Sequence, residues 1–296
     1  MKLLFVACLH NSEDFEPWLL PYLEKGATVY PFDYRTMPDP NRNLITTVET
    51  LGIDSVFIVK GESISAETIR YLNNIGVKTG VWTIDDHAHP ELYTAPYTHL
   101  WTPTPGLIEE YKRRCKNVHE LAFYVEPKLF AQTRDFVNIE DVSFLGTRYA
   151  GREDKITNLR TAGLDVALWG DQWTIKNNGR IQRYLDCLDL WHNTKVNLNI
   201  HQKTMRELSA LNTKMYEIPA AGGFMVTDYF PEVLRKFASD EVALYDTDDP
   251  NSLLETVKRF LTRPDERRTV MERARTRILT EHTAERRAEQ VLMEFQ

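Results

Sequence analysis

Short apolar runs alternate with stretches of helical periodicity along most of the chain. Runs of roughly four to eight apolar residues, bounded by glycine or polar residues, are typical of strands that are buried on both faces. In the first half this pattern predicts strands over residues 2–8, 28–32, 55–59, 78–84, 98–102 and 118–121, and helices over 13–25, 44–51, 65–74 and 105–116. Strands that alternate with helices in this way indicate βαβ units and a parallel sheet.

The same pattern starts again after a stretch without periodicity, residues 122–140, which we interpret as a linker. It predicts strands over 141–145, 165–169, 195–200, 224–227 and 242–245, and helices over 151–162, 180–190, 212–221, 231–237, 250–261, 264–280 and 283–295. We therefore expect an α/β protein with two Rossmann-like domains, residues 1–130 and 131–296, that face each other across a cleft.

Composition narrows the class of protein. The 296 residues are 42% hydrophobic and 27% charged, and the formal net charge is −7. An acidic chain has no global electrostatic attraction to nucleic acid or to an anionic membrane, whereas an anionic small molecule needs only a few well-placed donors. The apolar run before Cys8 is too short for a signal peptide, and no run reaches the roughly 20 residues of a membrane span. We expect a cytoplasmic protein.

The three cysteines, Cys8, Cys115 and Cys187, are far apart and odd in number. No pair has the spacing of a zinc site, and no disulfide framework is indicated. We expect buried, reduced thiols, no metal site and no bound cofactor.

Polar residues follow the predicted strand 78–84. Open α/β sheets bind ligands beyond the carboxyl ends of their strands, so residues in this position are candidates for chemistry. Two carboxylates and an imidazole, Asp85, Asp86 and His87, suit a base that deprotonates an acceptor hydroxyl. A structural alternative is that Asp86 caps a helix and that the loop is satisfied by its own backbone.

In the second half, a helix that carries Lys214 and Glu217 leads into Gly222-Gly223 and an apolar strand. Residues three apart lie on the same side of a helix. A carboxylate at a cleft suits bidentate bonding to ribose hydroxyls, and a lysine beside it suits a diphosphate. The alternative is a surface Glu–Lys pair on an ordinary helix that ends at glycine.

The segment NTKMYEIPAAGGFMVTD, residues 212–228, resembles the nucleotide-binding segment of GT-B glycosyltransferases, and is most similar to the CgeB-like spore maturation branch within the group 1 glycosyltransferases. The stretches VSFLGTRYAGRE (142–153), ALWGDQW (167–173), KVNLNIHQKTMRE (195–207) and DDPNSLLETVKRFLTRPDERR (248–268) resemble the same family in the same order. In the first half the resemblance is looser.

The resemblance implies a GT-B fold in which the second domain holds a nucleotide-sugar donor and the first binds the acceptor. Carried over by position, Asn212 and Lys214 would contact the donor, Glu217 would bind the ribose, and Gly222 and Gly223 would let the backbone approach the donor. Two departures stand out: Lys214 replaces the usual arginine, and Ser209 occupies the position where many retaining relatives have the first glutamate of a Glu-x7-Glu motif.

The donor's leaving group gains negative charge as the glycosidic bond breaks, and cationic side chains or helix N-termini must stabilise it where no metal does. Gly146 and Arg148 lie in the loop expected to face the diphosphate, and Arg152 begins the next helix. Three more residues are candidates for donor contacts: Arg206, His201 and Trp169. For Trp169 the alternative is burial in the core.

The sequence thus predicts a glycosyltransferase that moves a sugar, with UDP as the expected carrier, onto a hydroxyl acceptor. The only nucleic acid expected as a partner is one in which a modified base serves as the acceptor. A sugar-nucleotide epimerase of the same fold and a non-catalytic nucleotide-sugar binder are alternatives. A Rossmann oxidoreductase is disfavoured, because no GxGxxG motif follows the first strand: residues 8–13 read CLHNSE.

Overall fold

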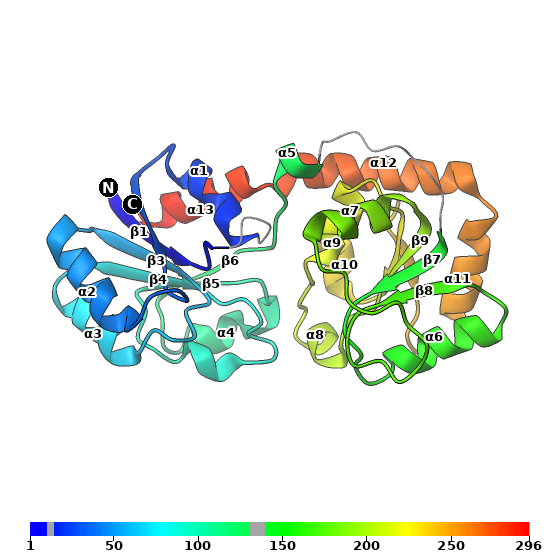
Figure 1. Ribbon diagram of the computed structural model, residues 1–296, viewed down its shortest axis with the longest axis horizontal. Helices are drawn as coiled ribbons and strands as arrows, with labels where there is room; N and C mark the ends of the chain where they lie inside the picture. Colours follow the sequence, from blue (N-terminus) through cyan, green and yellow to red (C-terminus); the bar gives the residue numbers. More distant parts are fainter. Residues whose placement is uncertain (11–14, 131–139, 296) are drawn as a thin grey trace. The chain divides into compact units, whose positions relative to one another are not determined.

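The computed structural model describes residues 1–10, 15–130 and 140–295. The chain forms two compact units, each built on one parallel sheet (Figure 1). Unit 1 comprises residues 1–123, 207–210 and 284–296, and unit 2 comprises residues 124–206 and 211–283. The predicted α/β architecture with two Rossmann-like sheets is confirmed, whereas the units themselves are interleaved along the chain and are not two continuous ranges.

Unit 1 contains a six-stranded sheet of order β2-β1-β3-β4-β5-β6, in which every pairing is parallel. The elements of unit 1 are β1 (Lys2–Ala7), η1 (Glu16–Leu19), α1 (Leu20–Leu23), β2 (Thr28–Asp33), α2 (Pro40–Leu51), β3 (Ser55–Val59), α3 (Ala66–Asn74), β4 (Lys78–Trp82), η2 (Pro90–Tyr93), β5 (His99–Thr102), η3 (Pro105–Leu107), α4 (Ile108–Tyr111), β6 (Asn117–Glu120) and α13 (Ala284–Phe295).

The helices of unit 1 begin and end where local chemistry favours it. Asp39 accepts a hydrogen bond from the Arg42 N–H at the start of α2, and Ser65 does the same for Thr68 at the start of α3. Gly52 ends α2 in the left-handed conformation, with φ 62°, which glycine adopts without a steric penalty. The end of α2 and both ends of α3 lie within one residue of the predicted boundaries, whereas α2 begins four residues before the predicted start.

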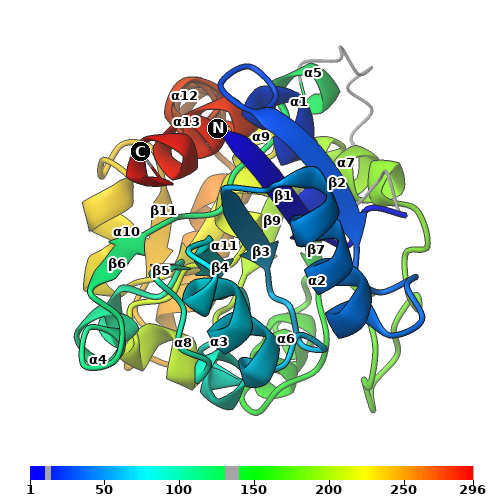
Figure 2. The ribbon, with the colours of Figure 1, turned by 90° about the vertical axis from the view of Figure 1, so that its left-hand side faces the viewer.

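The C-terminal helix α13 covers the unit 1 sheet beside α1, on the face opposite α2 and α3 (Figure 2). Phe295 packs against Trp101, with ring centroids 5.2 Å apart, and Arg287 donates from Nε to the Ala122 carbonyl at 2.8 Å. Gly80 leaves room for both aromatic rings, because a Cβ there would lie 2.8 Å from Phe295. The tail of the chain is therefore an integral part of the core of unit 1.

Unit 2 contains a five-stranded parallel sheet of order β11-β10-β9-β7-β8. The elements of unit 2 are α5 (Pro127–Phe130), β7 (Glu140–Leu145), α6 (Arg152–Thr161), β8 (Val166–Trp169), α7 (Tyr184–His192), β9 (Thr194–Asn199), α8 (Lys203–Glu207, whose last residue joins unit 1), α9 (Lys214–Ala220), β10 (Met225–Asp228), α10 (Pro231–Lys236), β11 (Ala243–Tyr245), α11 (Ser252–Leu261) and α12 (Pro264–Glu281).

Helices cover both faces of the unit 2 sheet. On one face, α6 and α11 bury Ile156, Leu159 and Val257 against alternate strand residues, and on the other face α9 packs against α7 and α12 (Figure 1). Burial of both faces explains why the strands read as continuous apolar runs. The loops that follow the strands lie at the carboxyl edge of the sheet, and they contain the polar candidate residues of unit 2.

Three predicted helices are shorter in the structure. The helix predicted over 180–190 begins at Tyr184, and the one predicted over 105–116 is a 3₁₀ turn followed by the four residues of α4. Residues 13 and 14 of the helix predicted over 13–25 lie outside the described residues, and its remainder contains η1 and α1. In residues 1–10, 15–130 and 140–295, no helix has the length and apolar character that crossing a membrane requires.

Candidate functional site

The strand order of unit 2 reverses at β7, which lies between β8 and β9. In open α/β sheets ligands bind beyond the carboxyl ends of the strands at such a reversal point. The loops that leave this point begin at Gly146, after β7, and at Ile200, after β9. The predicted donor residues can be placed relative to these two loops.

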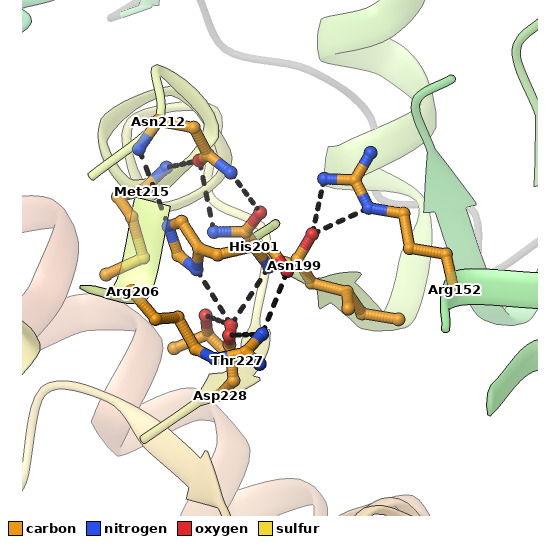
Figure 3. Close-up of polar contacts among 9 residues, drawn as sticks. Arg152, Asn199, His201, Arg206, Asn212, Met215, Thr227 and Asp228 are labelled. Carbon is orange, nitrogen blue, oxygen red and sulfur yellow. Dashed lines mark hydrogen bonds and ion pairs between the residues drawn. The ribbon is translucent and has the colours of Figure 1, made fainter. Parts of the chain in front are cut away.

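Arg152 links the two loops. Its guanidinium donates from Nε to the Ile200 carbonyl at 2.8 Å and from Nη2 to the same oxygen (Figure 3). Its Nη1 donates to the Thr147 carbonyl at 2.9 Å. The residue is 8% exposed, and burial lowers the pKa of its guanidinium to about 10. Three of its five N–H donors therefore hold the backbone together. The structure accordingly gives Arg152 the role of a loop bridge, although it was expected to contact phosphate.

A buried ion pair lies below the loop that follows β9. The Nδ1 atom of His201 is 2.7 Å from Oδ1 of Asp228, the last residue of β10, and both side chains are fully buried (Figure 3). Burial alone would raise the pKa of Asp228, but the charge and hydrogen bonds of His201 outweigh it and hold that pKa at about 2. Asp228 therefore carries a negative charge in the interior, compensated by His201.

Arg206 completes this cluster. Its Nη1 atom donates to the His201 carbonyl at 3.1 Å and lies 3.4 Å from Oδ2 of Asp228. His201 and Arg206 were both expected to contact the donor. The structure brings them together on Asp228, where they fix the course of the chain between β9 and α9. Arg206 is half-buried, so part of its guanidinium still faces the edge of the sheet.

Two asparagines position the start of α9. Asn199 and Asn212 exchange side-chain amide hydrogen bonds, at 3.2 Å and 2.8 Å, and Oδ1 of Asn212 accepts the N–H of Met215 at 3.3 Å. The Asn212 N–H also lies 3.5 Å from Nε2 of His201. The end of β9 is thus joined to the first turn of α9 by side chains that are themselves held in place.

Lys214 and Glu217 lie on the first turn of α9, as predicted. Oε1 of Glu217 accepts a hydrogen bond from the hydroxyl of Tyr184 at 3.0 Å, and Glu217 is 8% exposed. Burial lowers the pKa of Lys214, the charge of Glu217 opposes this change, and the nearby Arg152 lowers the pKa further. Within the part of the chain that the structure describes, the Lys214 ammonium makes no hydrogen bond or ion pair. Two cations thus lie close together with no anion bound to Lys214.

The glycine loop after β7 is packed backbone to backbone against the loop after β8. A Cβ at Gly170, where φ is 128°, would lie 2.1 Å from the Gly146 carbonyl oxygen. Arg148, in the same loop, is exposed and pairs with Glu153 at 3.0 Å. Glu153 also accepts hydrogen bonds from the N–H and hydroxyl of Thr174. Arg148 therefore lies on the surface of this loop, ion-paired, and not at the centre of the edge.

Gly222 and Gly223 are not at this edge. They come immediately before β10, at its amino end, whereas ligands are expected beyond the carboxyl ends. A Cβ at Gly223 would lie 2.7 Å from the Trp191 carbonyl, and Gly222 has a φ of 78°. Close packing against α7 and a left-handed turn account for both glycines.

Trp169 lines a pocket of about 420 Å³ beside β8, together with Ile181, Leu190 and several polar residues. Its indole Nε1 is buried and has no hydrogen-bond partner among the residues the structure describes. The indole of Trp173, in the loop after β8, donates to the Gly146 carbonyl at 2.9 Å. Neither indole N–H is therefore available to a ligand.

In unit 1, the carboxylate of Asp86 is sealed from solvent, with 0% exposure. It accepts hydrogen bonds from four hydroxyls, those of Thr83, Thr102, Thr104 and Tyr111, at 2.5–3.2 Å. Burial raises the pKa of Asp86, and these hydrogen bonds oppose that rise. A carboxylate with this surrounding joins β5 and α4 to the end of β4 and is not available to a substrate.

Asp85 and His87 are more accessible. Asp85 is exposed, has a left-handed backbone with φ 62°, and pairs with Lys60 at 3.3 Å, while His87 is half-buried. Both remain candidates for contact with an acceptor. Among the described residues, no group of three or more His, Cys, Asp or Glu side chains is arranged to hold a metal ion.

Sequence reasoning missed two residues of this edge, Asp228 and Tyr184. Asp228 ends a predicted strand, and a carboxylate at that position is itself a signal, although its partners come from another loop. Tyr184 gave no signal, because its contact with Glu217 joins residues 33 positions apart.

Residues 152–293 match the sequence profile of a family described as glycosyl transferase-like. No curated protein is significantly similar to the chain. Solved structures of the same fold include HepE from Anabaena in complex with UDP and glucose, with a TM-score of 0.65, 11% identity, and 99% of this chain and 98% of that chain covered. Sucrose-phosphate synthase from Thermosynechococcus elongatus has a TM-score of 0.66 at 11% identity, with 98% and 97% covered. The OtsA apo structure has a TM-score of 0.70 at 11% identity, with 100% and 99% covered.

These likenesses extend over nearly the whole of each chain. Together with the two parallel sheets, they establish the GT-B glycosyltransferase fold. The match to the glycosyl transferase-like family is confined to residues 152–293.

Proposed function

We propose that this protein is a glycosyltransferase that moves a sugar from a nucleotide-sugar donor, a UDP-sugar, to a hydroxyl acceptor. The observation that carries the proposal is Lys214. Lys214 is half-buried at the carboxyl edge of the unit 2 sheet, near the charges of Glu217 and Arg152, and among the described residues its ammonium makes no hydrogen bond or ion pair. Two neighbouring cations in a partly desolvated position are costly unless an anion binds there, and a diphosphate is such an anion.

Glu217 complements Lys214. It lies one turn further along the same face of α9, where the hydroxyl of Tyr184 donates a hydrogen bond to its Oε1. A carboxylate oriented in this way is suited to the hydroxyls of a ribose. We assign the ribose to Glu217, the diphosphate to Lys214 and the exposed part of Arg206, and the acceptor to unit 1.

A contact between Trp169 and the nucleobase stays a prediction, and its indole Nε1 is too buried to bond a ligand directly. HepE, a structure of the same fold, binds UDP. We therefore take UDP as the first nucleotide to test, and we retain the CgeB-like branch as our expectation for the subfamily.

The chemistry needs stabilisation of a leaving diphosphate. As the bond from the sugar to the phosphate oxygen breaks, negative charge grows on that oxygen, and a fixed cation at this position lowers the barrier. Lys214 would supply this charge, so we propose that no metal is needed. Turnover that is unchanged by EDTA is the expected result.

The test measures the binding of UDP, GDP, dTDP, CDP and ADP by thermal shift and by calorimetry. A ligand at 100 times its dissociation constant stabilises a protein by about 2.7 kcal/mol, which is a readily visible shift. Lys214→Met and Glu217→Gln should each lose at least tenfold in affinity for the diphosphate that binds wild type. Lys258→Met and Glu255→Gln change the same residue types at exposed positions of α11 and serve as matched controls.

If no diphosphate binds, or if the two variants bind as well as wild type while staying folded, the donor site is not at α9. If a UDP-sugar is converted to its epimer without an added acceptor, the protein is an epimerase. Binding without turnover of UDP-sugars on a panel of acceptors would make it a nucleotide-sugar binder.

A further inference from the structure

The cations at the carboxyl edge of the unit 1 sheet are already paired with carboxylates. Among the described residues that lie between a strand of unit 1 and the helix after it, the basic side chains are Arg35 and Lys60. Arg35, after β2, pairs with Glu62, after β3, at 3.0 Å. Lys60, which directly follows β3, pairs with Asp85, after β4, at 3.3 Å. Neither cation is left free for a ligand at the edge where this fold class binds ligands.

Carboxylates outnumber cations in these loops. Besides the two paired carboxylates, the loop after β2 contains Asp39, and β2 itself ends at Asp33. Burial alone would raise the pKa of Glu62, but hydrogen bonds from the Tyr34 hydroxyl and the backbone and the charges of Arg35 and Lys60 outweigh it and lower the pKa. Glu62 is therefore ionised, and the edge as a whole is acidic.

The charge of the whole unit has the same sign. Over residues 1–123, 207–210 and 284–296, 20 Asp and Glu residues outnumber 13 Lys and Arg residues. Unit 1 thus carries the whole net charge of −7, and the acidic and basic residues of unit 2 are equal in number. The field of unit 1 repels anions beyond the range of single contacts, over a Debye length of about 10 Å at 0.1 M salt.

Arg42 is the unpaired cation closest to these loops along the chain. It lies on the first turn of α2, is exposed, and makes no ion pair among the described residues. Its backbone N–H donates to Oδ1 of Asp39 at 3.1 Å, which places a carboxylate at the start of the same helix. Strong recognition of a phosphate or carboxylate uses several converging donors, and a single solvated arginine supplies too few of them.

Paired charges are well suited to hydroxyl groups. A hydroxyl can donate to a carboxylate oxygen and accept from an ammonium, so it can bind at the Lys60–Asp85 pair without separating the two charges. An anion would have to take a cation away from its carboxylate and would leave that carboxylate uncompensated. The same argument applies to a cationic ligand, which would have to displace Lys60 or Arg35.

We propose that the acceptor is an uncharged sugar or polyol, a molecule with hydroxyls but without phosphate or carboxylate groups. The inference rests on the glycosyltransferase function proposed above and on the assignment of the acceptor to unit 1. It deepens that proposal by selecting one chemical class of acceptor, and it selects against nucleic acid, phosphorylated sugars and anionic lipids.

The experiment compares acceptors in pairs that differ in charge: glucose with glucose 6-phosphate, glycerol with glycerol 3-phosphate, and p-nitrophenyl β-glucoside with p-nitrophenyl β-glucuronide. Transfer from UDP-glucose, UDP-galactose and UDP-N-acetylglucosamine is measured as UDP release above that in water alone. We expect kcat/KM to be at least about tenfold higher for the uncharged member of each pair that is used. This ratio should shrink as the salt concentration rises from about 0.01 M to about 1 M, because salt screens the field of unit 1.

A matched pair of double variants tests where the field acts. Glu67→Lys with Glu91→Lys reverses two exposed charges near the carboxyl edge, at the start of α3 and on η2 after β4. Glu24→Lys with Glu49→Lys makes the same change in net charge near the amino edge, just before β2 and β3. The first variant should lower the preference for uncharged acceptors at least threefold, and the second should leave it within twofold of wild type.

Three results would overturn the inference. The first is a charged acceptor that is used as well as its uncharged partner or better, and loss of that activity in Arg42→Gln would identify the anion site. The second is an equal effect of the two double variants, which would contradict the placement of the acceptor at this edge. The third is a wild type that binds UDP but transfers sugar to no acceptor of either kind, which would contradict the proposed function and the acceptor class with it.

Discussion

Each unit places a histidine and an aspartate together at the carboxyl edge of its sheet, and the two pairs differ in exposure. In unit 2, His201 and Asp228 are 2.7 Å apart and both are 0% exposed. In unit 1, His10 and Asp33 are 2.9 Å apart and the histidine is 51% exposed. The same two side chains thus form a structural ion pair in one unit and an accessible acid–base pair in the other. Residue type does not separate these roles, whereas burial does.

The difference has a physical origin. A buried charge must be compensated inside the protein, so His201 and Arg206 both bind Asp228 and have few donors left for a ligand. An exposed histidine keeps one nitrogen for exchange with substrate or solvent. We expect the unit 2 pair to contribute more to stability than the unit 1 pair, and four further measurements test this difference and its surroundings.

The largest effect is expected from Asp228→Ala. Removing one partner of a buried ion pair leaves the other charge uncompensated, and the free energy of unfolding should fall by about 3–5 kcal/mol. Urea-induced unfolding followed by circular dichroism measures this change. His10→Ala, which removes the exposed partner of the unit 1 pair, should cost less than about 1 kcal/mol. Equal losses in the two variants would show that burial does not distinguish the pairs.

Arg152→Met should have the next largest effect. It keeps the length of the side chain but leaves the carbonyls of Ile200 and Thr147 without their donor, at a cost of about 1–3 kcal/mol in unfolding free energy. Arg152→Lys should recover only part of the loss, because an ammonium lacks the planar fork that reaches both oxygens.

The control for Arg152 lies on the same helix. Arg160 also donates to two carbonyls, those of Lys176 and Val166, both at 2.7 Å, but it is more exposed. Arg160→Met should cost about 1 kcal/mol or less. If Arg160→Met destabilises the protein as much as Arg152→Met does, burial does not strengthen the contribution of the Arg152 bridge to stability.

A pH titration sharpens the comparison further. The pKa of Asp228 is about 2 in the folded protein against an ordinary value of 3.8. A lowered folded pKa means that this contribution, about 2 kcal/mol, is present above pH 4 and is lost as the pH falls towards 2. Asp86 acts in the opposite direction, because its pKa is raised. Asp228→Asn should therefore flatten the acid loss of unfolding free energy between pH 4 and 2, and an unchanged slope would contradict the assignment.

The smallest effect is expected from Asp85→Asn. The substitution breaks an exposed pair with Lys60, and asparagine tolerates the left-handed backbone at this position, so the unfolding free energy should change by less than about 1 kcal/mol. The kcat for UDP release should stay within threefold of wild type. A loss of a hundredfold or more would favour Asp85 as the base.

Much of the proposed donor site at α9 could be predicted from the sequence, because its signals are local. Lys214 and Glu217 are three residues apart on one helix, and helical geometry alone predicts that they share a face. The glycines at 222 and 223 were harder to interpret. Their sequence is compatible with close approach to a ligand, and only the strand direction places them at the amino end of β10.

The candidate acid–base residues of unit 1 show the opposite case, because contacts between distant segments decide their surroundings. Asp85, Asp86 and His87 are adjacent in sequence and attracted a catalytic interpretation, yet the three threonines and the tyrosine that seal Asp86 come from β5, α4 and the turns beside them. His10 and Asp33 are 23 positions apart and meet because β1 and β2 are neighbours in the sheet.

The sequence by itself thus determined the α/β class, the order of strands and helices along the chain, and the residues that follow each strand. These features depend on burial along a single element, which leaves a period in the apolar pattern. The tertiary structure decided which strands are neighbours, which carboxylates are sealed, and where the C-terminal helix packs. These depend on contacts between distant segments, and the burial of a polar group is a property of its surroundings that no local pattern records.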